Sequence, residues 1–154
     1  MTRSYQPRTR RDVLGLAVAG AAAAIALPTA AFATPDKVAE EIKKLFGDKK
    51  LMPGKIKLDL PSIAENGLVV PLGFEVESPM TEKDYVKSVH LFAEGNPTVN
   101  VAAYYFSPLA PKAAAAVRIR LAKSQEIVAV AEMSNGEVYT ARKEVKVTIG
   151  GCGG

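Results

Sequence analysis

Short runs of alternating apolar and polar residues fill most of the chain after residue 55, and they constrain its fold more than any other feature. Such alternation is typical of a strand with one buried and one wet face. The expected strands cover 56–60, 68–77, 85–93, 99–106, 116–121, 127–132, 138–141 and 145–149. Turn residues separate them about every ten residues, as at Asn66-Gly67, Gly95-Asn96-Pro97 and Ser134-Asn135-Gly136. This spacing predicts a mainly β protein, an immunoglobulin-like antiparallel β-sandwich.

One short helix is expected ahead of the strands, over residues 35–46. Pro35 suits a first helical turn, and Gly47 can end the helix in a left-handed conformation. Its apolar stripe consists of Val38, Ile42, Leu45 and Phe46. The stripe either packs on the domain or binds a partner, and packing is the simpler expectation. Residues 113–116 could start another helix, but the alternation of arginines and apolar residues over 117–121 favours a strand.

The first 33 residues have the pattern of an export signal. Arginines precede an apolar stretch from Val13 to Leu27, which is short for a membrane span, and Ala31-Phe32-Ala33 follows as a small-x-small cleavage signature. The segment Thr9-Arg10-Arg11-Asp12-Val13-Leu14 favours the twin-arginine route, although paired arginines also suit an ordinary leader. We expect cleavage after Ala33 and a periplasmic protein. The predicted organisation is a signal peptide at 1–33, a helix and β-sandwich at 34–149 and an arm at 150–154.

The charge balance changes once this leader is removed. The whole chain has 20 Lys and Arg against 16 Asp and Glu, a net charge of +4. Residues 1–33 hold four of the basic residues and one acidic residue, so 16 basic and 15 acidic residues remain, for a net charge of +1. A near-neutral chain gives no compositional support for nucleic-acid binding, and an aromatic content of 6% argues against base stacking. We expect no nucleic-acid partner, and no membrane association of the mature form.

The feature that carries chemistry is the ending Gly150-Gly151-Cys152-Gly153-Gly154, which holds the only cysteine. Glycines on both sides predict a flexible arm, and three extended residues would carry the thiol about 10 Å from the last strand. A single cysteine excludes an intramolecular disulfide, and a single histidine leaves no zinc, haem or histidine-relay cluster. A mobile tail also cannot hold a nucleophile in fixed geometry with His90. No catalytic residue, metal or cofactor is therefore expected.

Several interpretations of this tail remain open. Cys152 could carry a covalent group between enzymes, or it could join two structural sandwiches through a disulfide. Alternatively, the Gly154 carboxylate could be charged as a thiocarboxylate, and the simplest alternative is a frayed end with an incidental thiol. The covalent carrier is favoured. If its cargo is sulfur, a single cysteine has a rationale, because a second thiol would attack a persulfide and expel the cargo by exchange.

The ending, joined to an exported β-sandwich, resembles the SoxY family, the sulfur-carrier subunits of the periplasmic thiosulfate-oxidising Sox system. The residues from Pro61 to Pro71 contain Ala-Glu-Asn-Gly and Val-Val-Pro, similar to a family segment. The residues from Arg118 to Gln125 resemble the family's Arg-Ile-Arg-Leu-Ala…Gln segment. Asn96-Pro97 lacks the second proline that often follows in the family, which is a loop variation.

The resemblance implies a mechanism and a set of partners. A subunit called SoxZ would form a heterodimer with this chain, and the haem enzyme SoxXA would couple thiosulfate to Cys152 as an S-thiosulfonate. The hydrolase SoxB would release sulfate and leave a persulfide, which SoxCD would oxidise where that enzyme exists. Cofactors would belong to these enzymes, and Gly150, Gly151, Gly153 and Gly154 would give the arm its flexibility. Residues 65–67 are interpreted as turn residues, and the aromatic run 104–106 as core packing or a SoxZ contact.

Overall fold

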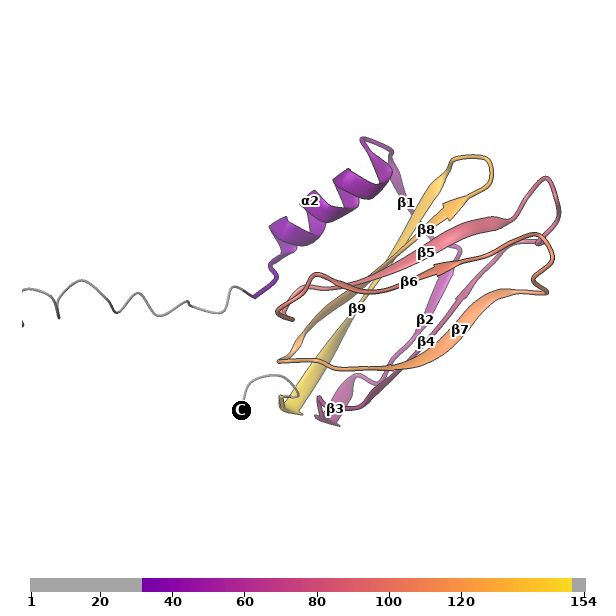
Figure 1. Cartoon of the computed structure of the whole chain (residues 1–154). Helices are drawn as coiled ribbons and strands as arrows, with labels where there is room; N and C mark the ends of the chain where they lie inside the picture. Colours follow the sequence, from indigo (N-terminus) through magenta and orange to yellow (C-terminus); the bar gives the residue numbers. More distant parts are fainter. Residues whose placement is uncertain (1–31, 151–154) are drawn as a thin grey trace, which may run out of the picture. The chain divides into compact units, whose positions relative to one another are not determined.

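Two β-sheets packed on one another make up the protein, which a computed structural model describes over residues 32–150 (Figure 1). The larger sheet has the strand order β1-β9-β8-β5-β6, with β3 paired to β9, and the smaller sheet has the order β2-β4-β7. The strands are β1 Leu51–Pro53, β2 Ile56–Asp59, β3 Ile63–Asn66, β4 Val70–Val76, β5 Val86–Ala93, β6 Asn100–Tyr105, β7 Ala113–Ile119, β8 Gln125–Met133 and β9 Val138–Ile149. The predicted mainly β sandwich is confirmed.

The main core lies between the two sheets. Strand β4 shows how the sequence builds it, because Val70, Leu72, Phe74 and Val76 are buried while the intervening positions are exposed or half-buried. Leu91 of β5 and Ile127 of β8 reach the same core from the larger sheet, and both are fully buried. In β4, period-two alternation therefore points one apolar face of the smaller sheet into the core and leaves the other face wet.

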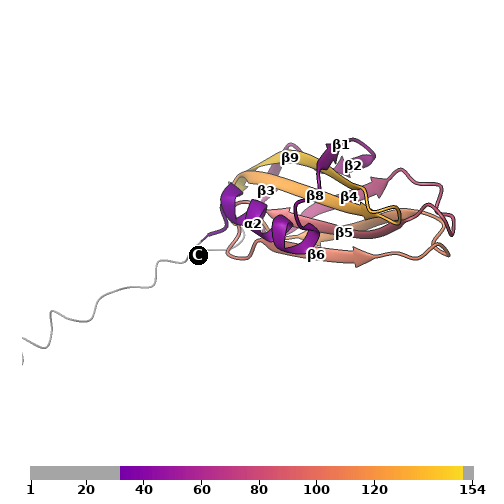
Figure 2. The same cartoon turned by 90° about the horizontal axis from the view of Figure 1, so that it is seen from above.

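Helix α2, Pro35–Phe46, packs on the outer face of the larger sheet (Figure 2). Its buried side chains contact buried residues of β5, β8 and β9, and this second cluster consists of Val38, Ile42, Phe46, Phe92, Val128, Val130 and Val138. Strands β5 and β8 are consequently buried on both faces along most of their length. Leu45 belongs to the predicted stripe, yet 45% of its surface is exposed and it is not part of this cluster.

Capping residues define both ends of α2. The Thr34 hydroxyl caps the first turn by accepting a hydrogen bond from the Lys37 amide at 3.4 Å. At the other end, Gly47 has a φ of 70° and its amide donates to the Lys43 carbonyl at 2.8 Å. The predicted helix over 35–46 is confirmed. Among residues 32–150, no helix is long and apolar enough to cross a membrane.

Strand β9 differs most from the sequence prediction. It runs unbroken through 12 residues, whereas two strands were expected at 138–141 and 145–149. Polar residues 142–144 interrupt the apolar alternation but stay in the ladder, since Arg142 pairs with Val128 and Glu144 with Glu126. The short strands β1 and β3 were not expected, and both pair with β9 in parallel.

Residues 113–116 lie in strand β7, which agrees with the preferred strand interpretation over a helix. Within 32–150, glycines with a positive φ occur at Gly47, Gly54 and Gly136, and the last of these lies in the predicted Asn135-Gly136 turn. Neither Asn66 nor Gly67 has a positive φ. There, the Asn66 side-chain oxygen accepts the Leu68 amide at 2.9 Å, which turns the chain without left-handed backbone.

Candidate functional site: the root of the C-terminal arm

Strand β9 leads directly into the predicted arm. Gly150 is the last residue described, and Gly151, Cys152, Gly153 and Gly154 lie outside the described residues. Cys152 is only two residues beyond Gly150, so its Cα can be at most about 7 Å from the Gly150 Cα. The geometry of the arm root therefore limits where the thiol can go.

Strand β3 and the turn that follows it hold one side of this root. The Gly67 amide donates to the Ile149 carbonyl at 2.7 Å, and the Lys146 amide donates to the Ser62 carbonyl at 3.0 Å. Between these two bonds, β3 runs parallel to β9, with Asn66 paired to Ile149. The Asn-Gly segment, interpreted from sequence as a simple turn, is thus a neighbour of the last strand residue.

The segment 121–124 holds the other side. The Ser124 hydroxyl accepts the Val147 amide at 2.9 Å. A Cβ placed on Gly150 would collide with the Ala122 carbonyl oxygen, so only glycine permits this close approach. The Leu121 amide also donates to the Gly67 carbonyl at 2.8 Å, which joins the two sides of the root.

The buried side chain of Asn96 holds segment 121–124 in place through hydrogen bonds to the backbone. Its side chain is 7% exposed, its Nδ2 donates to the Arg120 carbonyl at 2.8 Å, and its Oδ1 accepts the Ala122 amide at 3.0 Å. The Gln125 Nε2 also donates to this Oδ1 at 2.9 Å and to the Lys123 carbonyl at 3.0 Å. Buried amides with all these partners satisfied specify one loop conformation.

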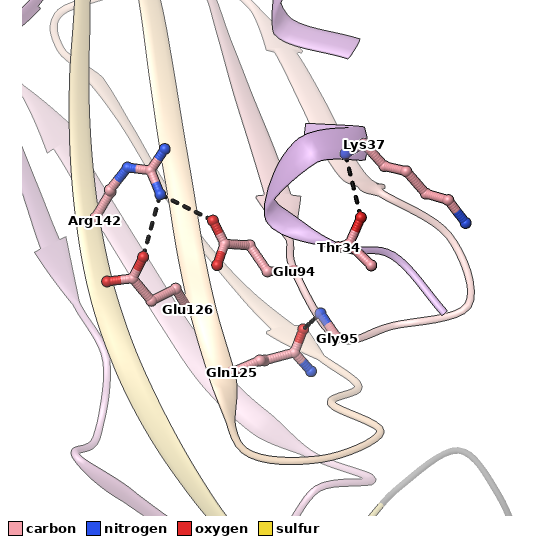
Figure 3. A network of polar contacts seen from close by, with 7 residues as sticks. All are labelled: Thr34, Lys37, Glu94, Gly95, Gln125, Glu126 and Arg142. Atoms are coloured by element: carbon pink, nitrogen blue, oxygen red, sulfur yellow. Dashed lines mark hydrogen bonds and ion pairs between the residues drawn. The ribbon is translucent and has the colours of Figure 1, made fainter. Parts of the chain in front are cut away.

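Gln125 extends this network to the loop that carries Asn96. The Gln125 Oε1 accepts the Gly95 amide at 2.7 Å (Figure 3). Nearby, Arg142 of β9 pairs with Glu94 at 2.8 Å and with Glu126 at 3.2 Å. These ion pairs are partly exposed, so each contributes about 0.2–1 kcal/mol to stability. The buried side-chain amides of Asn96 and Gln125 therefore hold the arm root more strongly than the ion pairs do.

From the sequence, 65–67 and 95–97 are predicted to be turns, and the family resemblance adds the segment 118–125. Neither Ser124 nor Gln125 has a predicted role of its own. The structure brings all three segments together at the arm root. The signal in the sequence is that Asn96 and Gln125 are polar residues close to apolar ones. Their burial depends on contacts between residues about 25–30 positions apart in the chain.

His90, the only histidine, is a packed residue of β5 and not part of the arm root. It is 6% exposed, with the Phe46 ring 5.3 Å away edge-on and the Phe92 ring 6.2 Å away, stacked. Its Nδ1 has no hydrogen-bond partner. Burial lowers the pKa of His90 below its usual value, against a smaller upward effect of Glu132.

No group of three or more His, Cys, Asp or Glu side chains within 32–150 is arranged to hold a metal ion.

Of the aromatic run 104–106, Tyr104 and Phe106 pack on Phe74 in the core, whereas Tyr105 is 76% exposed. Alternate aromatics therefore do occupy opposite faces of β6 and its continuation.

Comparison with known proteins shows the family of this chain. The family described as "Sulfur oxidation protein SoxY" matches residues 42–152, a range that includes Cys152. The sulfur carrier protein SoxY from Chlorobium limicola f thiosulfatophilum is similar in structure, with a TM-score of 0.64 and 30% identity over 75% of this chain and 100% of that chain. None of the curated proteins matches the chain.

Superoxide reductases share the fold alone. The neelaredoxin of Ignicoccus hospitalis has a TM-score of 0.54 at 22% identity, covering 75% of this chain and 94% of that one. A putative superoxide reductase from Thermotoga maritima has a TM-score of 0.53 at 16% identity, covering 69% and 89%. The extent of the family match and the identity to a solved carrier decide the assignment: this chain belongs to the SoxY family of sulfur carriers.

Proposed function

We propose that this chain carries inorganic sulfur as covalent adducts on Cys152 during periplasmic thiosulfate oxidation. The observation that carries the proposal is the position of the only cysteine, two residues beyond an anchored Gly150 and with glycine on both sides. A fixed arm root, and glycines in place of bulky residues around Cys152, suit a thiol that enters the narrow active sites of separate enzymes while the domain stays folded. The tether supplies a high effective concentration at each docked enzyme.

The proposed chemistry begins with oxidative coupling. The Cys152 thiol and thiosulfate form a sulfur–sulfur bond, with loss of one proton and two electrons, which the haem enzyme SoxXA accepts. Hydrolysis by SoxB then adds water across the bond to the terminal sulfonate sulfur. Sulfate and a proton leave, and Cys152 retains a persulfide. SoxCD, where present, oxidises the outer sulfur for a second hydrolysis. Within this scheme the chain itself performs no catalysis.

The proposed setting is the periplasm, in a heterodimer with SoxZ. The leader pattern of residues 1–33 supports export, and Arg10-Arg11 supports the twin-arginine route, which moves folded proteins. Folded export would let the partner subunit assemble before crossing. Exposed Tyr105 on edge strand β6 supports a protein contact at that edge, since exposed aromatics are enriched at interfaces.

Intact-mass spectrometry without reductant tests the carrier function. The chain is purified with its partner subunit and incubated with thiosulfate and the loading enzyme. We expect reductant-labile adducts on the wild type and none on Cys152→Ser, with an unchanged circular dichroism spectrum. Deleting Gly153 and Gly154 serves as the matched control, because it removes the carboxyl terminus used by a thiocarboxylate carrier and keeps the thiol.

The outcomes separate the alternatives. A reductant-labile adduct that still forms on Cys152→Ser would refute the proposal. Loss of the adduct in the truncated chain, while Cys152 still reacts with an alkylating reagent, would favour the thiocarboxylate. A disulfide dimer that remains the active species, with activity lost on reduction, would favour the structural role.

A further inference from the structure

The surface around the arm root carries exposed apolar side chains. Leu68 and Val69 follow directly after Gly67, and they are 46% and 56% exposed. Ile149, the last residue of β9, is 66% exposed. Within residues 32–150, eight large apolar side chains are exposed, and with Ile63 of β3 four of them belong to β3, the turn after it and the end of β9. Exposed apolar residues therefore gather at this end of the domain and are not scattered evenly.

Backbone contacts bring the turn that carries Leu68 and Val69 to the end of β9. The Gly67 amide donates to the Ile149 carbonyl at 2.7 Å, and Leu68 is the next residue in the chain. The Leu68 amide in turn donates to the Asn66 side chain at 2.9 Å, which fixes the turn. Strand β3 lies beside the end of β9, with Asn66 paired to Ile149 (Figure 1). We call Leu68, Val69 and Ile149 the root patch.

The chain segments that form the root patch contain no charged residue. Neither residues 66–74 nor residues 147–150 include Asp, Glu, Lys or Arg, although charged residues make up 23% of the chain. Charged residues are depleted at the centre of protein interfaces, where apolar side chains are covered by a partner. The root patch therefore suits a partner whose contacting surface is also apolar and uncharged.

The short distance between the domain and the thiol indicates which partner covers the patch. The Gly150 backbone lies close against the Ala122 carbonyl, and Cys152 follows only two residues later. The thiol can therefore reach no further than about 10 Å from Gly150. An enzyme that encloses this thiol in a narrow active site must bring the rim of its entrance against the surface around Gly150. The root patch is part of that surface.

We propose that the root patch is a docking surface shared by the enzymes that act on Cys152, each of which covers it with the apolar rim of its active-site entrance. The inference rests on the proposed carrier function, because a tethered thiol obliges those enzymes to approach this end of the domain. Apolar contact is non-directional, so one patch suits entrances of different shape. The patch contacts the enzyme equally before and during the reaction, so it lowers the KM for the carrier and leaves kcat unchanged.

Steady-state kinetics with two enzymes tests the proposal. The double variant Leu68→Ser, Val69→Thr removes apolar surface and keeps the turn, since Leu68 contributes its backbone amide to it. We expect at least a tenfold fall in kcat/KM, through KM, for loading by the haem enzyme and for sulfate release by the hydrolase. Cys152 should still react with iodoacetamide at the wild-type rate. Ile149→Thr, a second and independent variant, should change KM in the same direction.

Leu109→Ser is the matched control. Leu109 is 93% exposed and lies in the loop between β6 and β7. Strand β7 begins at Ala113, which pairs with Val76, whereas the root patch precedes Val70 at the other end of β4. The control therefore removes an exposed leucine at the opposite end of the sandwich, and it should keep wild-type kinetics with both enzymes.

The outcomes separate this inference from the proposed function. Wild-type kcat/KM in the double variant would overturn the docking surface and leave the carrier function intact, because adducts would still form on Cys152. A fall with only one enzyme would overturn the shared use. Impaired assembly with the partner subunit, or a changed oligomeric state of the chain alone, would assign the patch to a subunit contact and also overturn the proposal. Absence of adducts on the wild type would overturn both.

Discussion

Replacing Asn96 by Ala should loosen the arm root and lower the stability of the whole domain. The substitution removes the acceptor of the Ala122 amide and the donor to the Arg120 carbonyl, at 3.0 Å and 2.8 Å. The Gln125 amide group loses one of its two acceptors as well. Each stranded buried group costs about 1–3 kcal/mol, and partial access of water reduces the sum to about 3 kcal/mol.

Thermal unfolding followed by circular dichroism gives the magnitude. For a domain of roughly 120 residues, 1 kcal/mol corresponds to about 3–5 °C, so the midpoint should fall by about 10 °C. Asn135→Ala is the matched control, because it makes the same chemical change in an exposed turn where Asn135 Oδ1 accepts the Glu137 amide at 2.9 Å. Its cost should stay near 1 kcal/mol or below.

Hydrogen exchange supplies the local measurement. In Asn96→Ala, the amides of Leu121, Ala122 and Gly67 should lose protection, because the segment that anchors the root is no longer held from beneath. The reasoning is refuted if Asn96→Ala unfolds within 1 °C of Asn135→Ala. It is also refuted if the midpoint falls while the Leu121 and Ala122 amides stay as protected as in the wild type.

Three further perturbations test other parts of the structure. Gly150→Ala should expose the Gly67 amide to exchange with a stability change of about 1 kcal/mol or less, because the new Cβ meets the Ala122 carbonyl; unchanged exchange would contradict the contact. The lowered pKa of His90 means that the folded state binds a proton less readily than the unfolded one, so stability is full above about pH 6.5 and falls as the pH drops below it. Urea unfolding at pH 7.5 and 5 should show this loss, and His90→Leu should reduce it; an equal loss in both proteins would exclude His90 as its source. Ile42→Ala should cost about 2–4 kcal/mol in urea unfolding, since Ile42 is buried between α2 and the sheet, whereas exposed Leu45→Ala should cost under 0.5 kcal/mol; equal costs would contradict the packing of α2.

The sequence predicts the sandwich well because its signal is local. Strand β4 alternates strictly, and Pro35 and Gly47 mark the ends of α2 through residue chemistry within one turn. The short strands β1 and β3 escape prediction because they have three and four residues and form only against β9, which lies far along the chain. No local pattern encodes that pairing.

One part of the candidate site is likewise predicted from the sequence, and another part is not. Cys152 stands out from sequence because it is the only thiol and lies among glycines. The anchor at the arm root does not, since Asn96 and Gln125 become a buried pair only when the loop that carries Asn96 meets the start of β8. A polar residue in a loop is ordinarily read as solvated, so its role at the root emerges from the tertiary structure alone.

The continuous strand β9 also has a mechanical consequence. Its ladder partners, β8 on one side and β1 and β3 on the other, place hydrogen bonds across the strand axis from Val138 to Ile149. A force applied to the C-terminal end along that axis acts on these hydrogen bonds together, in shear, and does not break them one after another. The larger sheet therefore shares the force applied at the C-terminal arm, so that drawing the arm into a narrow active site does not unfold the domain.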